Sequence, residues 1–158
     1  YGLMYVEPEE GMPSCDVEYY VMQSEIYAEE PAATAEDPNL LEFSFANGLK
    51  EDPMFVVFNG REGALTDKPL MVKQGQRVRL YVGNAGPNLV SSFHVIGAIF
   101  DAVYPYGGLM SPPLRGLQTT LVPSGGATIV DIETSVPGNL TLVDHSIFRI
   151  DKGGVGFL

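Results

Sequence analysis

VGNAGPNLVSSFHVIGAIFDAVY, residues 82–104, places one of the two histidines of the chain in an apolar segment that opens with turn residues. Glycine accepts positive φ and proline fixes its own φ, so the first part of the segment is typical of turns. The apolar residues that follow predict a short strand buried on both faces, namely Val90, Phe93, Val95, Ile96, Ile99 and Phe100. His94 is therefore expected at a core or cleft position.

The second histidine, His145, follows another apolar strand that leaves the turn at 136–139. Outside Cys15, the two histidines are the only candidates for acid–base or soft-metal chemistry. Imidazole ordinarily titrates near neutral pH and is a common ligand for transition-metal ions. From position alone, His94 is more often a core histidine bonded to the backbone, and His145 a solvated residue before a short helix expected at 146–152.

The composition bounds the class of protein. At 158 residues the chain fits one domain with a real core, and 18 glycines with 12 prolines favour a loop-rich globular fold. Twenty acidic against nine basic residues give a net charge of −11, which disfavours binding to nucleic acid. No apolar run reaches the length of a membrane span.

A single cysteine excludes an internal disulfide. Residues 1–6 predict a strand, and no initiator methionine or signal peptide precedes them. We therefore expect the chain to be part of a longer polypeptide, with any targeting information upstream.

Further strands are predicted at 17–27, 54–58, 77–82, 118–122, 127–133 and 140–143. In 77–82 the alternation places Val78, Leu80 and Val82 inward and Arg77, Arg79 and Tyr81 outward. Gly125-Gly126 predicts a hairpin turn. Residues 28–52 are interpreted as an acidic surface excursion pinned by its own apolar patch, formed by Leu40, Leu41, Phe43 and Phe45.

About nine short strands with turn signals at roughly ten-residue spacing favour an all-β antiparallel sandwich or barrel with Greek-key connections. Beyond periodicity, several motifs closely resemble the second cupredoxin domain of copper-containing nitrite reductases. These motifs are YGLMYVEPEEGMP (1–13), VVFNGREGALT (56–66), GNAGPNLVSSFHVIG (83–97), QTTLVPSGGA (118–127) and LVDHSIFR (142–149).

The resemblance implies one cupredoxin-like domain over 1–158, the C-terminal half of a two-domain enzyme. It implies a periplasmic or cell-surface homotrimer that serves denitrification by reducing nitrite to nitric oxide with one electron and two protons. A type 1 copper in the first domain would receive the electron from a small donor protein, a cupredoxin or a cytochrome c. A type 2 copper at the interface between subunits would receive it next.

The resemblance also assigns roles to residues. The type 2 copper takes two histidines from the first domain of one subunit and a third from its neighbour, and this third ligand corresponds to His145. The histidine that relays a proton to nitrite corresponds to His94. Thr119 corresponds to the threonine beside that histidine, with Gln118 next to it in a supporting position. Ile96 corresponds to the apolar side chain over the copper.

Two further residues belong to this pattern. Ile147, two residues after the ligand, is expected to form another wall of the pocket. Asp144 is expected to cap the short helix or to accept a hydrogen bond near the ligand, because carboxylates suit harder ions than copper.

The chain departs from a complete enzyme in what it lacks. No Cys-His-Met set for type 1 copper can be assembled around Cys15, and the catalytic aspartate and two copper ligands of the first domain are missing. A first cupredoxin domain, in the same precursor or in a partner chain, is therefore expected. The alternative is a non-catalytic structural or trimer-assembly domain without bound metal. A two-domain laccase is disfavoured because the chain has no His-x-His motif.

Overall fold

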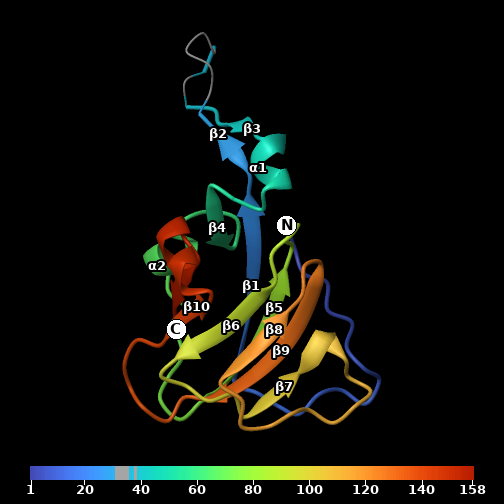
Figure 1. Ribbon diagram of the computed structural model, residues 1–158. Helices are drawn as coiled ribbons and strands as arrows, with labels where there is room; N and C mark the ends of the chain where they lie inside the picture. The colour runs from blue at the N-terminus through green and yellow to red at the C-terminus, as the bar shows by residue number, and fades with distance from the viewer. Residues whose placement is uncertain (31–35, 38) are drawn as a thin grey trace.

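The computed structural model describes residues 1–30, 36–37 and 39–158 (Figure 1). Its strands are β1 (Val17–Ile26), β2 (Ala28–Glu29), β3 (Glu42–Phe43), β4 (Phe55–Phe58), β5 (Arg77–Asn84), β6 (Ser91–Ile96), β7 (Ala102–Tyr104), β8 (Thr119–Val122), β9 (Gly126–Glu133), β10 (Thr141–Asp144) and β11 (Val155–Phe157). Its helices are the α-helices α1 (Phe45–Leu49) and α2 (Ala64–Asp67) and the 3-10 helices η1 (Pro105–Gly107) and η2 (Ile147–Lys152).

Two sheets form a sandwich. The order is β4-β1-β5-β9-β7 in the five-stranded sheet and β11-β10-β6-β8 in the four-stranded sheet. Apolar side chains from both sheets meet in one core, whose largest members include Phe58, Phe93, Phe100, Leu80 and Leu142. Alternating apolar residues on each strand supply these contacts, as the sequence pattern predicts.

One strand pair differs from the antiparallel expectation, because β1 and β5 are parallel. Parallel neighbours need a long crossover connection. Here the chain between Ile26 and Arg77 provides it, since this stretch contains β2, β3, α1, β4 and α2.

The Gly125-Gly126 turn joins β8 to β9, which lie in different sheets. The predicted hairpin is therefore wrong, and the turn carries the chain across the sandwich. Residues 1–8 also form no strand, contrary to the prediction. They lie instead against β5, where the rings of Tyr5 and Tyr81 are 4.8 Å apart.

Arg79 lies on the predicted outward face of β5, but this face is covered at Arg79 and not exposed to solvent. Its side chain is only 3% exposed and pairs with Asp131 of β9, with Nε to Oδ1 at 2.7 Å and Nη2 to Oδ2 at 2.9 Å. Nη2 also donates to the carbonyl of Pro13 at 2.9 Å. The N-terminal segment thus covers this face of the sheet.

The described part of the 28–52 excursion stands at one end of the molecule as the β2–β3 ribbon and α1 (Figure 1). Residues 31–35 and 38 of the excursion lie outside the described residues. Its apolar side chains do not pin it, because Leu40, Phe43 and Phe45 are 65%, 73% and 68% exposed. Polar contacts hold it instead: Ser44 Oγ caps α1 and bonds to Glu29.

None of the helices in the described part of the chain has the length and apolar character needed to cross a membrane.

Candidate functional site

Strand β6 presents His94 on its outer face. Phe93 and Val95 point into the core and are fully buried, whereas His94 is half-buried and Ile96 is 44% exposed. The prediction of a strand buried on both faces is therefore wrong, because the apolar run continues past β6 into an exposed turn. His94 lies at the surface of the four-stranded sheet and not in the core.

His145 reaches the same place from β10. Strands β6 and β10 are antiparallel neighbours, with Asp144 opposite Phe93, so the residue after β10 lies beside the start of β6. The backbone N–H of His145 donates to the carbonyl of Ser92 at 2.8 Å. The centroids of the two imidazole rings are 5.2 Å apart at an interplanar angle of 63°. The fold thus brings together the two histidines of the sequence.

The His94 ring is oriented from the other side by β8. Its Nδ1 lies 2.5 Å from the carbonyl oxygen of Gln118 and 3.4 Å from the hydroxyl of Thr119. A carbonyl only accepts hydrogen bonds, so Nδ1 carries a proton and donates it to Gln118. Nε2 is therefore the ring nitrogen of His94 that is available to a ligand or a second proton.

The other predicted site residues lie nearby on exposed positions. Thr119 is directly opposite His94 in the β6–β8 pairing. Gln118 touches His94 through its backbone, and its side chain is exposed. Ile147 is the first residue of η2 and is 41% exposed. Ile96 is two residues beyond His94, on the same face of β6.

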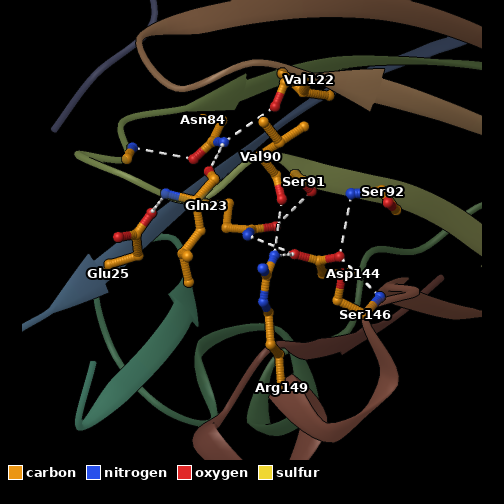
Figure 2. Close-up of polar contacts among 12 residues, drawn as sticks. Gln23, Glu25, Asn84, Val90, Ser91, Ser92, Val122, Asp144, Ser146 and Arg149 are labelled. Carbon is orange, nitrogen blue, oxygen red and sulfur yellow. Dashed lines mark hydrogen bonds and ion pairs between the residues drawn. The ribbon is translucent and has the colours of Figure 1, made fainter. Parts of the chain in front are cut away.

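Asp144 is fully buried beside His145 (Figure 2). Its Oδ1 accepts from the backbone N–H groups of Ser92 and Ser146, each at 3.0 Å. Its Oδ2 accepts from Gln23 Nε2 at 2.9 Å and from the guanidinium of Arg149. No side chain caps η2, so the helix-cap prediction is wrong, and Asp144 accepts hydrogen bonds next to the expected ligand.

Sequence reasoning missed Gln23 and Arg149 as members of this group. Gln23 is buried and also accepts from the Ser91 hydroxyl at 2.7 Å. Arg149 Nη1 donates to the carbonyl of Val90 at 2.8 Å. The polar side chain of Gln23 within strand β1 was an available signal. The sequence could not identify its partner, because Asp144 lies 121 residues away along the chain.

The described residues contain no group of three His, Cys, Asp or Glu side chains placed to hold a metal ion. The His145 ring is exposed, and neither of its nitrogens bonds to any described residue. A free imidazole nitrogen is a donor that suits copper. Cys15 is remote from the histidines, near Arg79, and burial is the main cause that raises the pKa of its thiol.

No protein-family model matches the chain. The curated relatives it matches are copper-containing nitrite reductases. Those of Neisseria gonorrhoeae and of Neisseria meningitidis serogroup B are 48% identical over 100% of the chain and 40% of their own length. That of Cereibacter sphaeroides is 31% identical over 96% of the chain and 44% of its length. The chain therefore spans less than half the length of these relatives.

Solved structures agree with the sequence matches. The Cu-containing nitrite reductase from Thermus scotoductus has a TM-score of 0.76 and 32% identity, over 92% of the chain and 31% of that structure. The enzyme from Nitrosomonas europaea has a TM-score of 0.74 and 31% identity, over 92% and 49%. A multicopper oxidase with 24% identity shares the fold alone. By sequence and by its cupredoxin-like all-β fold, the chain belongs to the copper-containing nitrite reductase family and matches part of the length of its members.

Proposed function

We propose that the chain is the C-terminal domain of an enzyme that reduces nitrite to nitric oxide and water, consuming one electron and two protons. The observation that carries this proposal is the pairing of the two histidines, 5.2 Å apart on one face of the four-stranded sheet. One supplies a ligand to a type 2 copper shared between subunits, and the other moves a proton.

His145 is the copper ligand in this proposal. Its exposed ring has a free lone pair, and its backbone is held by Ser92. Two histidines from the first domain of a neighbouring subunit complete the set. Bound copper supplies a Lewis acid and a one-electron donor for nitrite.

His94 holds the proton. The carbonyl of Gln118 keeps Nδ1 protonated, so the second proton binds at Nε2 and leaves from there. Thr119 Oγ1, 3.4 Å from Nδ1, flanks the ring. Ile96 and Ile147 are exposed apolar side chains, each two residues beyond one of the histidines, and in this proposal they restrict how nitrite lies in the completed pocket.

The proposal includes the partners that complete the site. A first cupredoxin domain carries the type 1 copper, and a homotrimer brings that domain against the histidine pair. A small cupredoxin or cytochrome c delivers the electron, and the enzyme works in the periplasm or at the outer cell surface. The fact that the relatives are longer than this chain supports the expectation of a further domain.

The first experiment replaces His145 with Ala in the full-length protein. We expect loss of the type 2 copper signal in electron paramagnetic resonance, with the type 1 visible absorption unchanged, because only the shared site loses a ligand. Retention of type 2 copper would refute the assignment of His145.

The second experiment replaces His94 with Ala. Both coppers should remain, and turnover should fall by about 100- to 10,000-fold, the range for loss of a general acid. Unchanged turnover near neutral pH would refute the relay. If the full-length protein binds no copper at all, the alternative of a structural domain for trimer assembly replaces the enzyme.

A further inference from the structure

We infer that Gln23 and Arg149 are positioning residues for the type 2 copper ligand, acting on His145 through the buried carboxylate of Asp144. The inference rests on the proposed function, because it assigns these residues to the copper site proposed there. Both residues contact Oδ2 of Asp144, the residue that precedes His145 in the chain (Figure 2).

Asp144 Oδ1 lies between the two backbone segments that carry the histidines. It accepts from the backbone N–H of Ser92, two residues before His94, and from that of Ser146, one residue after His145. The His145 N–H in turn donates to the carbonyl of Ser92. One carboxylate oxygen therefore ties together the two backbone segments that carry the histidines.

The other carboxylate oxygen, Oδ2, accepts hydrogen bonds from Gln23 and Arg149. Asp144 is completely buried, and a buried carboxylate is costly unless a cation and hydrogen-bond donors compensate it. Arg149 of η2 supplies the positive charge, and Gln23 of β1 supplies an amide donor. Without them the carboxylate lacks the partners that hold it against Ser92 and Ser146.

The same group contacts the start of β6 and the residue before it. Val90, Ser91 and Ser92 are consecutive, and each binds one member of the group. The Val90 carbonyl accepts from Arg149, the Ser91 hydroxyl donates to Gln23, and the Ser92 N–H donates to Asp144. Gln23, Arg149 and Asp144 thus set the path of the chain two residues before His94.

The test uses Arg149→Met in the full-length protein, depleted of type 2 copper and titrated with Cu²⁺ alone. Partners outside the ligand set typically contribute a factor of 10 to 100 to metal affinity. We expect type 2 copper affinity about 10- to 100-fold weaker, with an altered hyperfine splitting and unchanged type 1 absorption. Arg149→Lys, which keeps a cation beside Asp144, should restore most of the affinity.

Lys152→Met is the matched control. It removes the same charge from the same helix, but Lys152 pairs with Asp52, away from the histidines. Its copper affinity and spectrum should equal those of the unaltered protein. If Arg149→Met does not fold, Gln23→Met tests the same carboxylate oxygen from β1 without a change of charge.

Unchanged copper affinity and hyperfine splitting in a folded Arg149→Met or Gln23→Met protein would overturn the inference, even if its thermal stability fell. This failure is distinct from failure of the proposed function. In that case His145→Ala itself would keep type 2 copper.

Discussion

Two ion pairs built on buried aspartates hold different parts of the molecule. Arg79 and Asp131 join β5 to β9 through two parallel hydrogen bonds, and both side chains are 3% exposed. Arg149 contacts Asp144 through a single nitrogen and is 19% exposed. The remaining contacts of Asp144 go to Gln23 and to two backbone amides.

The two ion pairs differ in what they act on: the first stabilises the fold, and the second also positions the histidines. Both carboxylate oxygens of Asp131 accept hydrogen bonds from one guanidinium. This ion pair therefore stabilises only the five-stranded sheet and its contact with the N-terminal segment. In Asp144, Oδ2 contacts the guanidinium of Arg149, and Oδ1 accepts from the backbone segments next to the two histidines. We therefore expect changes at the first pair to alter stability alone and changes at the second to alter the copper site as well.

The largest loss of stability is expected for Arg79→Met. It leaves Asp131 buried without a cation, which costs about 3–5 kcal/mol in the free energy of unfolding. Urea unfolding measures this loss. Arg79→Met combined with Asp131→Leu should recover most of it, because no uncompensated charge remains. A single-variant loss below about 1 kcal/mol would contradict the expected role of this pair.

Asp144→Asn should lose about 1–3 kcal/mol, because its amide NH₂ must face either the backbone donors or Arg149 and Gln23. Type 2 copper affinity should fall with it. Asp131→Asn is the control, expected to lose stability while copper affinity stays constant. Urea unfolding and Cu²⁺ titration should be measured for both variants. Equal copper affinities would contradict the proposed difference between the two ion pairs.

Glu25 sharpens the comparison as a buried carboxylate held by neutral donors, the Tyr27 hydroxyl and the amides of Asn88 and Leu89. Burial, followed by the bond to Glu25, raises the pKa of Tyr27 to about 12. Tyr27→Phe should cost about 0.5–1.5 kcal/mol at neutral pH.

The Tyr27→Phe substitution should also change how the free energy of unfolding depends on pH in the alkaline range. The unfolded chain releases the Tyr27 proton near pH 10, whereas the folded protein keeps it to about pH 12. Stability from this group is therefore complete below pH 10 and is lost as pH rises through about 12. Tyr27→Phe should lack this part of the loss in unfolding measured from pH 9 to 12. Parallel curves for the two proteins would contradict the shift.

The smallest effect is expected at the exposed Lys152–Asp52 pair. A hydrogen bond to Lys152, then its charge, lowers the pKa of Asp52. The contact therefore stabilises the fold above the ordinary aspartate pKa and is lost as pH falls through the lowered value. Lys152→Met should leave the melting temperature at pH 7 nearly unchanged, because solvent screens the pair. A large drop would show that exposed pairs matter as much as buried ones here.

Most strands of the two sheets followed from local pattern, whereas β7 and β11 were not predicted. Alternation in 77–82 correctly placed Val78, Leu80 and Val82 in the core, because side-chain direction in a strand repeats every two residues. The same pattern failed for Arg79, since alternation tells which face a residue lies on but not what covers that face. The N-terminal segment covers it, through a contact 66 residues away.

The excursion at 28–52 shows the same limit. In its described part, the β2–β3 ribbon belongs to neither of the two larger sheets, and the apolar side chains expected to pin it are exposed. Hydrophobicity is a property of a residue, but burial requires a second surface, and no local pattern specifies one.

By itself, the sequence determined the two histidines, the turns and strands that carry them, and the motifs that place the chain in its family. Only the tertiary structure decided that the rings of His94 and His145 meet, because β6 carries His94 and His145 directly follows the neighbouring strand β10, far away in the sequence. It also decided that Gln23, Arg149 and Asp144 form one buried group. A buried charge must be compensated by whatever the fold brings beside it, and that depends on long-range contacts rather than on local order.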